Sequence, residues 1–302
     1  MSILLTYRPP YNWPQLRDFL AKRQIHGNEQ VHENGFSKIL SVADKRGDGS
    51  NEYVPIKVDI THAAKQNGFY LTFNAAHSRH TLSITNTIRR MLDLDINPQL
   101  IETGLRNAGL PENEIVSGLR IPGVASGFEA GCRAILGQQV SVTAAVNKVN
   151  QLHAFFAEQN GVYDLVFRFP TPDEVASNDL LFLKMPAARR QSLISLGKFY
   201  QHCEPLAALE NDEPSDTAGL TNTAELTNTA GLINIKGIGP WTVNYVLLRA
   251  IGESDIWLDT DLVIKQQLAK RREQGRAINA ELAAPWRSYL TLNLWRLAGL
   301  SH

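Results

Sequence analysis

Cysteine is scarce in this chain of 302 residues, which contains only Cys132 and Cys203. The two lie far apart and match no metal-binding spacing, so the chain cannot supply the four thiolates of an iron–sulfur cluster. They suggest no disulfide framework, and this composition fits a reducing cytoplasm. The histidines are scattered without ligand spacing. We therefore predict no catalytic metal and no required cofactor.

Long apolar runs and an excess of charge are also absent. No stretch approaches the roughly 20 apolar residues that span a bilayer, and the N-terminus lacks a basic segment followed by an apolar run. Basic and acidic residues each number 30, so any nucleic-acid surface must be local. We expect a protein without a membrane partner.

Alternation and turn residues predict a mixed N-terminal domain over residues 1–95. Residues 13–25 and 81–94 have helical periodicity. Residues 36–42, 53–60 and 69–73 read as strands separated by clusters of Gly, Asn and Asp. We interpret this domain as an α+β unit with an antiparallel sheet and a purely structural role.

From residue 97 onward the pattern is helical, which makes the protein mainly α. Helices are expected over 102–108, 127–136, 141–159 and 187–203. Thr171 and Glu174 have the spacing of a capping box. We divide this part into a helical bundle, 96–231, and a C-terminal helical domain, 232–302, that packs with about 96–117.

Residues 217–234 contain three near-copies of one hexamer, beginning at Thr217, Thr223 and Thr229. They are too few and too polar for a solenoid. We expect a surface connection whose last copy merges into the segment that follows.

The most informative segment of the chain comes next. It is Leu232-Ile-Asn-Ile-Lys-Gly-Ile-Gly-Pro240. Glycine permits positive φ and close backbone approach, and Pro240 suits the first turn of a helix. Exposed N–H groups at such a helix start favour a phosphate. An ordinary turn between two helices, with a glycine as C-cap, explains the glycines equally well. The isoleucines at 233, 235 and 238 are expected to anchor the turn in a core.

Several separate motifs, occurring in the same order along the chain, resemble those of a known protein family. The hairpin with Trp241-Thr-Val-Asn-Tyr245, and an Asp about twenty residues later, resembles the helix–hairpin–helix DNA glycosylase superfamily. The segments 118–123, 128–142, 261–266 and 285–289 are similar to the bacterial 3-methyladenine DNA glycosylase II family. The resemblance implies an antiparallel-sheet domain followed by two helical layers containing the hairpin motif.

Asp261 is the candidate catalytic residue. From the residues alone, it reads as the N-cap of the helix that follows, a role for which Asp259 and Thr260 compete. The resemblance aligns Asp261 with the family's essential aspartate. It also implies a base pocket formed by Trp241, Tyr245, Trp295 and the residue after the aspartate, here Leu262. Core packing is the alternative for these aromatic residues.

The resemblance further implies contacts with DNA. These involve the hairpin residues Lys236, Gly237, Ile238 and Gly239, and the interhelical turn residues Gln138 and Gln139. Gln139 occupies the position that fills the gap left by an extruded nucleotide, although a polar interhelical turn is the alternative. The backbone carbonyls of Ile233, Ile235 and Ile238 would hold a structural Na⁺ or K⁺ ion.

Basic residues also concentrate after Asp261. They outnumber the two acidic residues there, Glu273 and Glu281, and form either a phosphate-facing surface or a solvated helix face. The basic residues are Lys265, Lys270, Arg271, Arg272, Arg276, Arg287 and Arg296.

The function implied is that of a monofunctional glycosylase, a monomer, that releases alkylated purines such as 3-methyladenine and 7-methylguanine from damaged double-stranded DNA by base flipping. Relatives with lyase activity carry a nucleophilic lysine where this chain has Trp241. Two alternatives stay open: a glycosylase for oxidised or deaminated bases, and a non-catalytic DNA-binding protein. A bacterial, cytoplasmic and nucleoid-associated location follows from the resemblance.

Overall fold

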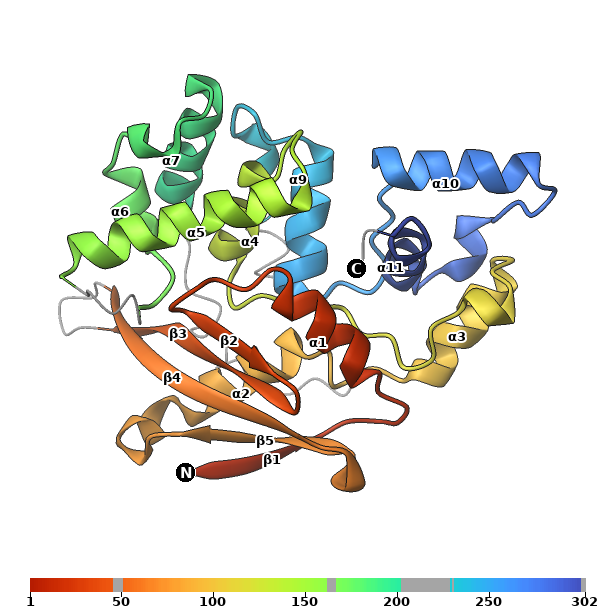
Figure 1. The fold of residues 1–302 in the computed structure, drawn as a ribbon, viewed down its shortest axis with the longest axis horizontal. Helices are drawn as coiled ribbons and strands as arrows, with labels where there is room; N and C mark the ends of the chain where they lie inside the picture. Colours follow the sequence, from red (N-terminus) through yellow and green to blue (C-terminus); the bar gives the residue numbers. More distant parts are fainter. Residues whose placement is uncertain (46–50, 162–166, 202–228, 230, 300–302) are drawn as a thin grey trace.

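The structure, a computed structural model, describes residues 1–45, 51–161, 167–201, 229 and 231–299 (Figure 1). Cys203 and the first two hexamer copies lie outside the described residues. No helix in the described ranges has both the length and the apolar character needed to cross a bilayer.

The N-terminal part is a five-stranded antiparallel sheet in the order β1-β5-β4-β3-β2. The strands are β1 (Ser2–Thr6), β2 (Glu29–His32), β3 (Gly35–Lys45), β4 (Asn51–Ala63) and β5 (Gly68–Phe73). The three long strands match the predicted ones, whereas the short edge strands β1 and β2 were missed. Edge strands of this kind make few side-chain contacts, so their alternation is weak.

Only one face of the sheet is buried. Along β4, Ile56, Val58 and Ile60 are fully buried while the residues between them are exposed. This alternation is typical of an antiparallel sheet with one solvated face. Two helices, α1 (Trp13–Ala21) and α2 (Thr81–Met91), contribute to the core on the buried face. Short 3₁₀ turns, η1 (Ala64–Gln66) and η2 (Ala75–His80), flank β5.

The remaining described chain is helical, as predicted. A second core joins α4 (Gly127–Leu136), α5 (Val142–Gln159), α6 (Pro172–Ala176), η4 (Leu181–Leu183), α7 (Ala187–Gln201), η6 (Gly231–Asn234) and α9 (Pro240–Val246). A third core joins α3 (Pro98–Asn107), η7 (Leu247–Ile251), α10 (Leu262–Glu273), η8 (Ala280–Ala283) and α11 (Arg287–Leu297). The short turn η3 (Glu112–Glu114) follows α3.

Side-chain caps fix several helix starts. The capping box predicted at α6 is present: Thr171 Oγ1 accepts from the Glu174 N–H at 3.3 Å, and the Glu174 carboxylate accepts from the Thr171 N–H at 2.7 Å. Ser141 Oγ accepts from the Ala144 N–H at the start of α5. These side-chain caps satisfy N–H groups that the first helical turn leaves without a backbone partner. The sequence signature therefore identified the helix start correctly.

A buried quartet of charges joins the sheet to the helical part. Lys38, on the buried face of β3, lies 2.7 Å from Glu29 and 3.2 Å from Glu129 of α4. Arg133, one turn further along α4, lies 2.8 Å from Glu129 and 3.1 Å from Glu29. Burial opposes ionisation of Glu29, but Lys38 and Arg133 outweigh it and lower its pKa to about 2. The quartet therefore fixes the sheet against α4.

We expect Glu29→Gln to lower the free energy of unfolding at neutral pH by about 3–5 kcal/mol. The reason is that Lys38 and Arg133 would each lose one of their two carboxylate partners. The pKa of Glu29 is depressed in the folded state, so its stabilisation is present above the unfolded pKa and is lost as pH falls toward 2. Chemical denaturation at pH 7 and pH 3 measures the difference between wild type and variant. That difference should shrink at pH 3. The exposed neighbour Glu33→Gln serves as control, and a pH-independent difference would contradict this account.

Candidate active site

Asp261 caps α10. Its side chain Oδ1 accepts from the N–H groups of Val263 at 2.9 Å and Ile264 at 3.1 Å. Negative charge at a helix N-terminus is stabilised by these donors and by the helix dipole. Asp259 and Thr260 are exposed and do not take this role. The capping interpretation is therefore correct for Asp261.

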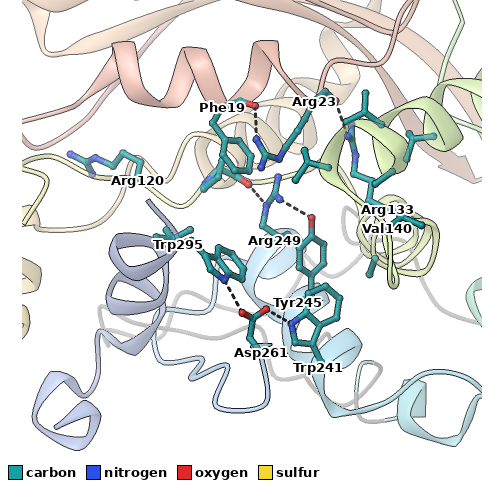
Figure 2. A pocket seen from close by; sticks show the side chains of 18 of the residues that line it. Phe19, Arg23, Arg120, Arg133, Val140, Trp241, Tyr245, Arg249, Asp261 and Trp295 are labelled. Atoms are coloured by element: carbon teal, nitrogen blue, oxygen red, sulfur yellow. Dashed lines mark hydrogen bonds between the residues drawn. The ribbon is translucent and has the colours of Figure 1, made fainter. Parts of the chain in front are cut away.

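The same carboxylate also faces a cavity. Trp241 Nε1 donates to Oδ2 at 2.9 Å, and Trp295 Nε1 donates to Oδ1 at 3.3 Å. Figure 2 shows Asp261 between the two indoles, which come from α9 and α11. Capping and pocket lining therefore coexist, because Oδ1 accepts from the helix N–H groups and from Trp295 while Oδ2 accepts from Trp241.

Trp241 and Tyr245 form one aromatic wall. They lie one turn apart on α9, and their rings stack with centroids 5.2 Å apart and an angle of 23° between planes. The helix begins at Pro240, as predicted, with Gly239 as its N-cap residue. Helical spacing brings residues four apart onto one face. The wall is therefore a direct product of the local sequence.

The cavity itself has a volume of about 220 Å³. Three of the four predicted pocket residues, Trp241, Tyr245 and Trp295, line it together with Asp261. The fourth, Leu262, does not: its side chain is 68% exposed. Leu262 is therefore not among the residues that line this cavity, unlike the other three.

Sequence reasoning missed the opposite wall. Gln15, Phe19 and Arg23, from α1 and the segment just after it, line the cavity (Figure 2). The N-terminal domain, for which we expected a purely structural role, therefore contributes side chains to the cavity. Periodicity marks α1 as amphipathic but carries no signal for what its polar flank faces. Other lining residues are Arg120, Pro122, Arg133, Ala134, Gly137, Val140, Val142, Ala145, Val146, Val149, Arg249 and Leu292.

The hairpin between η6 and α9 depends on Gly237. Its φ is +90°, and an added Cβ would lie 2.3 Å from Ser192 Oγ, so this position requires glycine. Ser192 Oγ in turn donates to the Lys236 carbonyl at 2.8 Å. Gly239 has an extended backbone instead, and a Cβ there would meet nothing within 4 Å. The backbone at Gly239 is thus open to approach from outside.

The isoleucines of the hairpin differ in burial. Ile238 is 5% exposed and Ile235 packs against the second core, but Ile233 is 45% exposed and anchors nothing. The Ile235 carbonyl accepts from the Ile238 N–H at 2.9 Å. A cation bound by these carbonyls stays a prediction. Among the described residues, no group of His, Cys, Asp and Glu side chains is placed to hold a metal ion.

The two glutamines between α4 and α5 have different surroundings. Gln138 Nε2 donates to the Gly237 carbonyl at 3.1 Å, which ties the turn to the hairpin. Gln139 is exposed, with φ of +57°, at the tip beside the 42% exposed Val140. Gln139 and Val140 are therefore exposed at this turn, whereas Gln138 contacts the hairpin.

Only part of the C-terminal positive charge is free of neighbouring acids. Arg271 and Arg276 pair with Glu114, and Arg287 pairs with Asp255. Arg296 donates to the Glu114 carbonyl at 2.7 Å. The exposed basic side chains that remain are Lys265, Lys270 and Arg272, all on α10. The basic surface is therefore narrower than the sequence suggested.

Comparisons with known proteins agree with this geometry. Residues 2–126 match the AlkA N-terminal domain family. The chain is 31% identical over 298 residues to DNA-3-methyladenine glycosylase 2 of Escherichia coli, covering 98% of this chain and 97% of that protein. The chain belongs to the DNA-3-methyladenine glycosylase II family. The resemblance seen in the sequence is thus confirmed.

The fold is shared more widely than this family. A 3-methyladenine DNA glycosylase from Archaeoglobus fulgidus superposes with a TM-score of 0.69 at 18% identity, covering 98% of this chain and 97% of that one. An 8-oxoguanine glycosylase/lyase from Clostridium acetobutylicum gives 0.53 at 13% identity, covering 89% and 98%. The predicted fold, a sheet domain followed by helices of the helix–hairpin–helix glycosylase type, is confirmed.

Removing either indole N–H group should remove one of the hydrogen bonds that hold the Asp261 carboxylate in place. We expect Trp241→Phe and Trp295→Phe each to lower the free energy of unfolding by about 1–2 kcal/mol, since each removes a hydrogen bond to a charged group. Denaturant titration in double-mutant cycles with Asp261→Ala measures the coupling. Trp257→Phe, in the third core but outside the cavity lining, should show no coupling to Asp261. Equal coupling for all three tryptophans would refute the assignment.

Proposed function

We propose that the protein hydrolyses the N-glycosidic bond of alkylated purines in duplex DNA. The observation that carries this proposal is the Asp261 carboxylate, held by four N–H donors at the edge of an aromatic cavity. Family membership supports the same class of reaction. The purines meant are of the 3-methyladenine and 7-methylguanine type.

The first step is extrusion of the damaged nucleotide into the cavity. Flipping costs about a few kcal/mol, and less where the base pair is already weakened. In this step the exposed Gln139, in the turn between α4 and α5, fills the space that the nucleotide leaves in the duplex. The open backbone around Gly239, at the N-terminus of α9, suits a DNA phosphate. Lys265, Lys270 and Arg272 add exposed positive charge on the neighbouring α10.

The second step is cleavage of the bond. As the base leaves, positive charge develops on the deoxyribose, and a fixed carboxylate stabilises it and orients the attacking water. The four N–H groups hold the Asp261 carboxylate in place before the reaction starts. A purine that is alkylated on a ring nitrogen already carries positive charge, so it leaves without a strong general acid. The stacked Trp241–Tyr245 wall favours such an electron-poor ring.

Asp261→Asn tests this mechanism directly. Asparagine keeps an oxygen for the helix cap but removes the charge, so we expect release of 3-methyladenine and 7-methylguanine from methylated DNA to fall by about 10²–10³-fold or more. Duplex binding, measured by fluorescence anisotropy, should survive. Asp259→Asn, two residues away and exposed, is the matched control. If wild type and both variants are equally inactive on methylated DNA while binding it, a non-catalytic DNA-binding protein is the better reading.

A same-fold glycosylase for oxidised or deaminated bases is the second candidate. The likeness to an 8-oxoguanine glycosylase/lyase shows that this fold is not confined to enzymes for alkylated bases. A panel of duplexes with one lesion each distinguishes the candidates by the rate of base release. The leading proposal requires methylated purines to be released.

We further propose that the enzyme has no lyase activity. A lyase of this superfamily needs a nucleophilic amine, and Trp241 occupies that position; a tryptophan cannot form a Schiff base. Within the part of the chain that the structure describes, no lysine lines the cavity. Purified protein incubated with an abasic duplex should leave the strand intact, as judged by denaturing gel electrophoresis. Strand nicking that disappears when one lysine is replaced would overturn this proposal.

A further inference from the structure

The wall of the cavity opposite Asp261 carries a buried positive charge. Arg249 lies in η7, where α9 continues as a π-helical turn, and it is 4% exposed. Single π-helical turns within a helix are frequently found at functional sites. Figure 2 shows the Arg249 side chain between Tyr245 and Phe19, with Asp261 across the cavity. The position therefore calls for an explanation beyond helix packing.

Arg249 is held by neutral groups. Its Nη1 donates to Tyr245 Oη at 2.8 Å, and its Nε donates to the Pro122 carbonyl. The guanidinium carbon lies 4.9 Å from the Phe19 ring centre and 5.4 Å from that of Tyr245. Among the described residues, no carboxylate forms an ion pair with it. Tyr245 and Phe19 thus orient the guanidinium without neutralising it.

A buried charge without a counter-charge is unfavourable. Burial lowers the pKa of Arg249, and burial together with Arg249 and Arg133 lowers the pKa of the nearby Arg23 to about 10. An arginine side chain remains protonated in proteins. A buried guanidinium at the wall of a cavity, such as that of Arg249, is a candidate for ligand recognition. A guanidinium has only donors, so its ligand must present an acceptor.

The alternative role for Arg249 is structural, namely to hold η7 against the segment that contains Pro122 and Val124. Its backbone carbonyl accepts from the Val124 N–H at 2.8 Å, and its Nε binds the Pro122 carbonyl. The first bond needs no particular side chain, and the second needs a donor but no charge placed beside a cavity. A structural role would also affect every substrate to the same extent. The two roles therefore differ in what they predict for different bases.

We propose that Arg249 reads the extruded base by donating a hydrogen bond to the 6-oxygen of a 6-oxopurine, such as N7-alkylated guanine or hypoxanthine. Guanine O6 is an acceptor that arginine recognises well, whereas adenine-type bases present an amino donor at this position. The proposal rests on the proposed glycosylase function. It adds a specificity-determining residue, with Tyr245 and Phe19 holding the guanidinium in place.

Methylated DNA provides an internal comparison, because it releases 7-methylguanine and 3-methyladenine in one reaction. In Arg249→Met, we expect 7-methylguanine release to fall roughly 10- to 100-fold more than 3-methyladenine release, as for loss of a charge-assisted hydrogen bond. Arg106→Met, on the exposed side of α3, is the matched control and should leave the ratio unchanged. Equal loss of both bases in Arg249→Met would overturn the proposal in favour of the structural role.

A second measurement uses only the wild-type protein, in case Arg249→Met fails to fold. Free hypoxanthine should inhibit release of methylated bases at a several-fold lower concentration than free adenine, because only hypoxanthine offers an oxygen at the 6-position. Equal inhibition, or stronger inhibition by adenine, would contradict the role of Arg249. If the wild-type protein releases no base from methylated or hypoxanthine-containing DNA, the glycosylase function fails instead. The two failures are thus distinguishable.

Discussion

The hydrogen bonds to one carboxylate organise the candidate site. Asp261 receives N–H groups from the start of α10, from Trp241 on α9 and from Trp295 on α11. Three helices must therefore converge for the side chain to be satisfied. A carboxylate fixed in this way needs little rearrangement when positive charge forms next to it. The requirement for a helix cap and the requirement for preorganised chemistry are met by the same atoms.

Much of this arrangement follows from local sequence rules. The capping box at Thr171, the alternation along β4 and the spacing of Trp241 and Tyr245 depend on near neighbours, and each was predictable. The need for a flexible residue at Gly237 was also predictable from the turn. Only the structure shows that a Cβ at this position would collide with Ser192 Oγ. Leu262 was expected beside the cavity only from its place after Asp261, and in the structure it is largely exposed. The short strands β1 and β2 carry too little alternation to be recognised.

The inner wall of the cavity could not be predicted, for a different reason. Phe19 and Arg23 reach it only because the sheet domain is docked on α4, and this docking depends on contacts between residues about a hundred positions apart, such as Arg133 and Glu29. No local pattern encodes such a contact. Arg249 was hidden likewise, since an arginine within an amphipathic helix normally reads as a solvated side chain. The cavity is therefore lined by charges of both signs: the carboxylate of Asp261 and the guanidinium groups of Arg23, Arg120, Arg133 and Arg249.

The sheet is joined to α4 by the buried quartet of Lys38, Glu29, Glu129 and Arg133. One of its members, Arg133, also lines the cavity, so the contact between the sheet and α4 shares a side chain with the cavity wall. A chain that lacked the sheet domain would keep Asp261 and both indoles, but the cavity would be open on the side that Gln15, Phe19 and Arg23 cover. The sheet domain is thus one wall of the cavity, and a shorter protein of this architecture would have to close that side with other residues.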